Sequence, residues 1–164
     1  MDGDSTSASK PGKPTVFLAT AATEIEPMFS PDGRWIAYVS NESGTAQVYV
    51  RPFPGPGGKW QVSSTSGADP TWSRTRPELF YRSLAGGVMV VSYKVEGDSF
   101  LADQARQWSD FFLTSRPRQR PFDLHPDGER IAASRRSTPH AQDKVVFVFN
   151  FFDDLRRIAP SGKR

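Results

Sequence analysis

Short runs of alternating apolar and polar residues, rich in Val, Phe, Tyr and Trp, occupy most of this 164-residue chain. Alternation with these residue types is typical of β-strands that pack on one or both faces. The clearest runs predict strands over 34–40, 46–53, 78–83, 87–95 and 130–135, and shorter ones predict outer strands over 59–64 and 106–112. No apolar run approaches the ~20 residues that a membrane-spanning helix needs. The pattern therefore predicts an all-β chain without a membrane span.

One unit of turn and strand occurs three times. The segment 29–40 (FSPDGRWIAYVS) aligns without a gap with 72–83 (WSRTRPELFYRS), 43 residues later, and with 124–135 (LHPDGERIAASR), 95 residues after the first. In the first copy Pro31-Asp32-Gly33 predicts a tight turn, because Pro fixes φ, Asp bonds to nearby backbone and Gly accepts a positive φ. Asp32 is therefore expected to be structural. Repeats of this size indicate a repeat architecture.

Two copies depart from this unit. The second has Arg74-Thr75-Arg76-Pro77 in place of the glycine-containing turn, so another turn geometry or a longer loop is expected there. The third has Ala133 where the first has Tyr38, so packing at that position should be thinner. Each departure makes one unit less regular without removing the repeat.

Each unit is predicted to begin with a short strand at 26–30, 69–73 or 121–125, and its third strand is predicted at 46–53, 87–95 or 144–151. Four antiparallel strands in about 40–45 residues are typical of a β-propeller blade. The predicted fold is an all-β propeller fragment over 14–160, with about three four-stranded antiparallel blades. We divide the chain into a disordered lead (1–13), a lone outer strand from a preceding blade (14–20), blades (24–65, 66–113 and 119–160) and a tail (161–164).

The repeat residues resemble a known family. FSPDGRWIAYVS, DPTWS and LHPDGERIA look like the PD40, or TolB-like, class of WD40-related β-propeller repeats. Residues 41–83 and 145–164 are also similar to the last blades of the extracytoplasmic propellers attached to bacterial serine/threonine protein kinases. The resemblance covers roughly residues 14–162 and implies a blade fold, an extracytoplasmic or periplasmic location and a binding role. It implies no particular ligand, because propellers carry unrelated functions.

Three units are fewer than the 4–8 blades that close a typical propeller. The explanation we prefer from the sequence is that the chain is the C-terminal part of a longer protein or a truncated gene product. In a second explanation a homodimer closes one six-bladed ring head to tail, and each copy lends residues 14–20 to the last blade of its partner. A third is an open three-blade arc with exposed edges. Residues 151–160 fit either a helix or an outer strand.

The formal net charge of +3 is unevenly distributed, with −2 over residues 1–115 and +5 over residues 116–164. A nucleic-acid interface would need these cations on one face with aromatic side chains between them, and no nucleic-acid-binding motif is present in the sequence. Arginine and lysine on strand edges discourage edge-to-edge pairing, which explains the basic end more simply. No nucleic-acid partner is therefore expected.

Cysteine is absent, which excludes disulfides and thiolate metal sites.

The sequence lacks the main signatures of catalysis. It has no G-x-S-x-G nucleophile elbow and no kinase motif. The segment 54–60 (PGPGGKW) lacks the spacing and the Ser or Thr of a phosphate loop, and we interpret it as a hairpin loop.

His125 and His140 have no second ligand pair, so His125 is expected in a turn. Asp153 and Asp154 are adjacent and make a poor acid/base couple. No catalytic, cofactor-binding or metal-binding residue, and no cofactor, is predicted.

Of the four tryptophans, Trp35, Trp72 and Trp108 are expected in the core, and Trp60 is the exception. The sequence thus predicts a non-catalytic module that binds a protein, peptide or glycan through residues that it does not identify. Two alternatives stay open. One is the propeller of a prolyl-peptidase-like hydrolase whose catalytic domain is absent from this chain. The other is a periplasmic TolB-like scaffold, which needs a signal peptide that residues 1–15 do not show.

Overall fold

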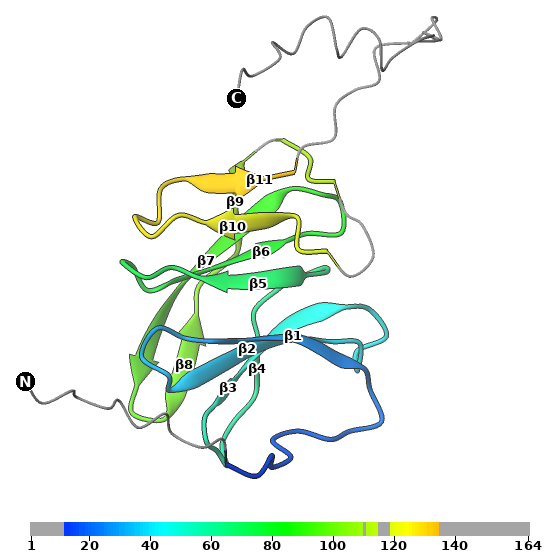
Figure 1. Ribbon diagram of the computed structural model, residues 1–164, viewed down its shortest axis with the longest axis vertical. Coiled ribbons are helices and arrows are strands. Elements are labelled where there is room, and N and C mark those ends of the chain that lie inside the picture. The colour runs from blue at the N-terminus through cyan, green and yellow to red at the C-terminus, as the bar shows by residue number, and fades with distance from the viewer. Residues whose placement is uncertain (1–11, 110, 115–118, 135–164) are drawn as a thin grey trace, which may run out of the picture.

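The computed structural model describes residues 12–109, 111–114 and 119–134, and these residues form antiparallel β-sheets. Figure 1 shows three sheets stacked in chain order, with β1 below, β5 in the middle and β10 above. Strand β5 contacts both β1 and β10. The first strand of each unit therefore lies beside the first strand of the next. The predictions for 144–151 and 151–160 lie outside the described residues.

The strands of the first sheet lie side by side in chain order: β1 (Glu24–Phe29), β2 (Trp35–Ser40), β3 (Gln47–Pro52) and β4 (Trp60–Gln61). The second sheet contains β5 (Ala68–Trp72), β6 (Glu78–Arg82), β7 (Val88–Glu96), β8 (Ser99–Ala102) and β9 (Arg106–Ser109). The third sheet, within the described ranges, contains β10 (Phe122–Leu124) and β11 (Ile131–Ala133). All paired neighbours are antiparallel, as short connections require.

Most predicted strands are confirmed. The first and second strands of all three units, and the third strands of the first two, form close to the predicted bounds. The outer strand of the first unit is shorter than predicted. In the second unit the predicted outer strand forms as β9, and a further strand, β8, pairs with the other end of β7. The prediction missed β8. Its signal is Gly97-Asp98, a typical two-residue hairpin loop between the paired residues Glu96 and Ser99.

The lone outer strand predicted at 14–20 does not form within this chain, and its pairing with a preceding blade stays a prediction. These residues are described but form no strand. A strand needs a neighbour that accepts and donates its backbone hydrogen bonds. The segment is instead held by side chains, because Leu18 packs against the buried residues Ile36, Tyr38 and Tyr49.

Two apolar clusters hold the sheets together. The larger, between the first and second sheets, contains Trp35, Ala37, Val39, Val48, Val50, Val62, Trp72, Leu79, Tyr81, Val91 and Phe100. The smaller, between the second and third sheets, contains Phe80, Val88, Val90, Leu113, Phe122 and Leu124. Because successive side chains of a strand point to opposite faces, Leu79 and Phe80 serve opposite clusters. Strand β6 is therefore buried on both faces.

The tryptophans follow the prediction with one correction. Trp35 and Trp72 are buried in the core, and Trp108 is half-buried with its ring edge-on to Phe80. Trp60, the expected exception, also packs against the core, with its ring 5.6 Å from that of Trp35. Ala133 is exposed, which confirms the thinner packing predicted there.

The turn of the first unit is built as its residues predict. Gly33 has a φ of 70°, and its N–H donates to the Ser30 carbonyl at 2.9 Å. Asp32 Oδ1 accepts hydrogen bonds from the Ser30 hydroxyl at 2.5 Å and the Arg34 N–H at 3.1 Å. Burial alone would raise the pKa of Asp32, but these two hydrogen bonds and the positive charge of Arg34 act together with nearby backbone to lower it. The aspartate therefore holds the turn closed as a carboxylate.

The third turn repeats this geometry. Gly128 has a φ of 74°, and its N–H donates to the His125 carbonyl at 2.9 Å. The Glu129 N–H donates to Asp127 Oδ1 at 2.8 Å. This hydrogen bond, aided by Arg130 and His125, lowers the pKa of Asp127.

The second turn, which lacks glycine, serves as a contact with the third unit. Ser73 Oγ accepts a hydrogen bond from the Arg76 N–H at 3.2 Å. The Thr75 hydroxyl donates to the Asp127 carbonyl at 3.1 Å, and the Arg76 guanidinium donates to the Gly128 carbonyl at 3.4 Å. The altered sequence of the second turn therefore gives it side chains that reach the third turn.

Replacing the two turn glycines by alanine tests this contact. Both have a positive φ, so either change should cost about 1–2 kcal/mol in the free energy of unfolding. A Cβ at Gly33 would meet nothing within 4 Å, whereas at Gly128 it would meet Thr75 Oγ1 at 2.7 Å and Ser73 Oγ at 2.9 Å. We expect Gly128→Ala to cost about 1 kcal/mol more than Gly33→Ala, because overpacking adds to the strain. Urea denaturation measures both, and equal losses would contradict the contact.

Candidate functional site

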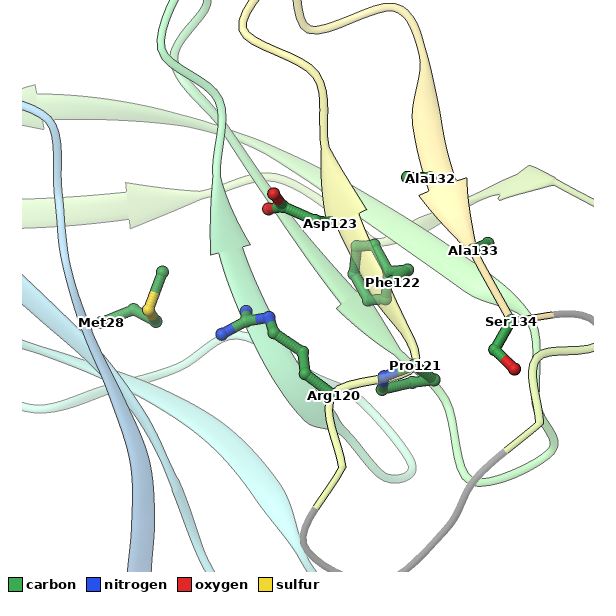
Figure 2. A pocket seen from close by; sticks show the side chains of 8 residues that line it. All are labelled: Met28, Arg120, Pro121, Phe122, Asp123, Ala132, Ala133 and Ser134. Atoms are coloured by element: carbon green, nitrogen blue, oxygen red, sulfur yellow. The ribbon is translucent and has the colours of Figure 1, made fainter. Parts of the chain in front are cut away.

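A groove of about 700 Å³ opens beside the first strands. Figure 2 shows the side chains that line it, which are Met28, Arg120, Pro121, Phe122, Asp123, Ala132, Ala133 and Ser134. Met28 belongs to β1, and the others belong to β10, β11 and their flanking residues. Because the lining comes from the first and third units, the groove depends on the stacking of the sheets.

Arg120 is the cation of this groove and is held in one orientation. Its Nη2 donates to the Thr71 hydroxyl at 2.6 Å, to the Asp69 carbonyl at 3.4 Å and to the Pro70 carbonyl. All three acceptors belong to β5, so the side chain ties the segment before β10 to the second sheet. In Figure 2 its guanidinium points toward β5 on the side of Met28. A side chain that is already fixed loses little conformational entropy when it binds a ligand.

Two equivalent β-bulges interrupt the first strands of the first two units. The pairing of β1 with β2, and of β5 with β6, shifts register at the same position of each unit. The bulges contain Glu26, with a φ of 57°, and Asp69, with a φ of 55°. This left-handed conformation costs residues other than glycine about 1–2 kcal/mol. It persists because both residues make specific hydrogen bonds.

These hydrogen bonds connect the sheets. Glu26 Oε2 accepts a hydrogen bond from the Asp69 N–H at 2.6 Å, and Asp69 Oδ2 accepts one from Arg82 Nε at 2.7 Å. The side chains of Asp69 and Arg82 are only 5% and 9% exposed. Two charges are tolerated there because each is paired with the other. With Arg120, these contacts form a continuous polar line from β1 through β5 to the third unit.

The groove combines one cation, one anion and apolar walls. Arg120 and Asp123 supply the charges, and Met28, Ala132 and Ala133 supply apolar surface. The described residues contain no group of three or more His, Cys, Asp or Glu side chains able to hold a metal ion. None of the described segments forms a helix long and apolar enough to cross a membrane. The arrangement suits recognition of an extended ligand that carries both charged and apolar groups.

The residues singled out in the sequence lie elsewhere. His125 lies in the third turn, as expected, where its Nδ1 accepts a hydrogen bond from the Asp127 N–H at 3.2 Å. Residues 54–59 lie in the connection between the paired strands β3 and β4, and Trp60 begins β4, which confirms the hairpin loop. His140 and the pair Asp153-Asp154 lie outside the described residues.

Sequence reasoning missed Asp69, Arg82 and Arg120. The sequence does contain a sign of the ion pair at Arg82, because the equivalent residues of the other units are the uncharged Val39 and Ser134. A cation in a buried strand needs a partner. For Arg120 the local sequence contains no such sign, since its hydrogen-bond acceptors lie about fifty residues earlier in the chain.

Two comparisons with known proteins give no match. The chain matches no protein-family model, and no curated protein matches it at a significant level. What the structure shows is an all-β architecture with antiparallel sheets of four, five and two strands in the part of the chain that it describes. The resemblance to TolB-like repeats remains a prediction from the sequence.

Arg82→Met tests the buried ion pair. It leaves the Asp69 carboxylate buried without its partner and should lower the free energy of unfolding by about 3–5 kcal/mol. Adding Asp69→Asn removes the orphaned charge, and asparagine also tolerates a positive φ. The double variant should therefore be more stable than Arg82→Met alone in urea denaturation. A double variant that is less stable than Arg82→Met would show that the two side chains are not coupled.

Proposed function

We propose that this chain is part of a β-propeller and acts as a non-catalytic binding module, whose Arg120 groove receives an extended peptide of a partner protein. The observation that carries the proposal is the line of polar contacts that joins the first strands of successive units through Glu26, Asp69 and Arg120. The blades of a propeller surround a central channel, so adjacent first strands are what this fold requires.

The repeat itself supports the propeller. Glu26 and Asp69 stand 43 residues apart, share a left-handed conformation and bond to each other across two sheets. Each unit thus meets the next through equivalent residues, as in other repeat architectures. The resemblance to kinase-attached propellers further supports an extracytoplasmic setting.

The lining of the groove favours a peptide over a glycan. Arg120 offers a positive charge that attracts a carboxylate, and Asp123 can accept a hydrogen bond from an N–H group. Stacking of a sugar needs an accessible aromatic face. The one aromatic residue of the lining, Phe122, is only 3% exposed. A peptide with an acidic group next to apolar side chains therefore fits best.

Selection of a phage-displayed random peptide library on the purified chain tests this function. We expect enriched peptides that carry a carboxylate near apolar residues and bind with micromolar dissociation constants in fluorescence anisotropy. Ser134→Arg places a bulky side chain in the groove and should weaken binding about tenfold, a loss of about 1.4 kcal/mol.

Ser99→Arg is the matched control, because it adds the same side chain at the exposed start of β8, outside the groove. Its affinity should equal that of the wild type. Failure to enrich any peptide, or equal weakening by both substitutions, would contradict a peptide site in this groove.

A further inference from the structure

The side of the first sheet that faces away from the second sheet carries exposed apolar side chains. We call it the apolar face and define it by five residues that are 37% to 82% exposed: Val16, Phe17, Ile25, Phe29 and Phe53. They line a groove of about 490 Å³. Gathered apolar side chains on a protein surface are the mark of an interaction site.

The equivalent side of the second unit is buried within the chain. At the offset of 43 residues, Phe29 and Tyr38 correspond to Trp72 and Tyr81. Both equivalents belong to the apolar cluster between the first and second sheets. In the second unit, therefore, the surface equivalent to the apolar face packs against the sheet that precedes it.

The aromatic pairs of the two units show that the equivalence extends to geometry. Phe29 meets Phe53 edge to face, with ring centroids 4.9 Å apart and an angle of 84° between the ring planes. Trp72 meets Tyr93 edge to face, at 5.3 Å and also at 84°. Phe53 and Tyr93 are equivalent, because each directly follows the residue that pairs with the first residue of the second strand. The apolar face is thus shaped like the surface that the second sheet buries against the first.

Residues 14–20 lie where a preceding sheet would have its outer strand. At the offset of 43 residues they correspond to 57–63, the segment that contains β4. Phe17 is the equivalent of Trp60, and its ring lies 5.6 Å from that of Phe53 on the apolar face. In Figure 1 the dark blue segment that leads into β1 runs below the first sheet. The counterpart of a fourth strand therefore already lies on the apolar face, although it pairs with no described strand.

We propose that a three-stranded antiparallel sheet of the same repeat covers the apolar face and takes residues 14–20 as its fourth strand. Because β1 to β4 lie side by side in chain order, the three covering strands should precede residue 14 in one polypeptide. A second copy of this chain cannot supply them, since its matching surface is already buried against its own second sheet. The proposal rests on the propeller part of the function proposed above and uses no residue of the Arg120 groove.

The junction of the first two sheets indicates what the covering sheet carries. There Ala37 and Val39 of the first sheet lie in the shared apolar cluster, and the Glu26 carboxylate accepts a hydrogen bond from the Asp69 N–H at 2.6 Å. The covering sheet should likewise offer small and β-branched side chains to the apolar face and an acidic side chain to the Glu26 N–H. A copy of the first unit has all of these groups.

The full chain with a copy of residues 21–56 inserted between Lys13 and Pro14 tests the proposal. The copy supplies three strands and gives 14–20 the spacing that 57–63 have after β3. By hydrogen-exchange mass spectrometry, we expect the amides of 16–20 to exchange at least about a hundredfold more slowly than in the wild type, because they join a sheet.

Phe29→Glu in the original unit, made with and without the insertion, tests the contact itself. Phe29 is 54% exposed in the wild type, so the urea midpoint should change little there. In the extended chain the same carboxylate would be buried without a partner, so the midpoint should fall and the slow exchange should be lost. Leu101→Glu is the matched control, since Leu101 is 45% exposed on β8 outside the apolar face, and it should have little effect in either chain.

Fast exchange of residues 16–20 in the extended chain would overturn the proposal, and so would equal effects of Phe29→Glu with and without the insertion. Peptide binding by the wild type is measured separately and does not depend on either result. Failure of the Arg120 groove to bind peptides is thus distinguishable from failure of the covering sheet.

Discussion

The packing of β5 and β6 against the first sheet is the contact on which the rest of the structure depends. Every residue of these two strands is buried. Leu79 and Tyr81 face the first sheet while Phe80 faces the third, so one short strand serves both clusters. Truncating a buried leucine to alanine costs about 2–5 kcal/mol in a typical core. The Arg120 groove exists only while this middle sheet holds the first and third units in place, because its lining comes from both.

Directional contacts give this apolar packing its register, because hydrophobic burial by itself favours no direction. The Trp72 indole N–H donates to the Met28 carbonyl at 3.0 Å, and the Asp69 N–H donates to the Glu26 carboxylate. The strained bulges of β1 and β5 turn these groups toward the neighbouring sheet. Strain of about 1–3 kcal/mol at such a residue persists where surrounding interactions hold it, as they do here.

Local patterns in the sequence were enough to predict most strands and the turn at Gly33, because alternation and turn residues act over a few positions. They failed where a tertiary partner decides the outcome. Residues 14–20 have strand-like composition but pair with no described strand, and Leu18 packs on a sheet face instead. The groove was beyond reach for the same reason, since Arg120 finds its acceptors in a different unit. Arg82 was missed as well, although a cation in an otherwise apolar strand could have indicated a buried partner.

Hydrogen exchange of the Trp72 indole N–H, followed by NMR and assigned with a Trp72→Phe variant, tests the stacked arrangement most directly. This proton bonds to the Met28 carbonyl across the junction of the first two sheets. If the sheets are stacked as described, it should exchange only when the protein unfolds, with a free energy of opening close to that of global unfolding. Exchange at the rate of a freely accessible indole would contradict the stack.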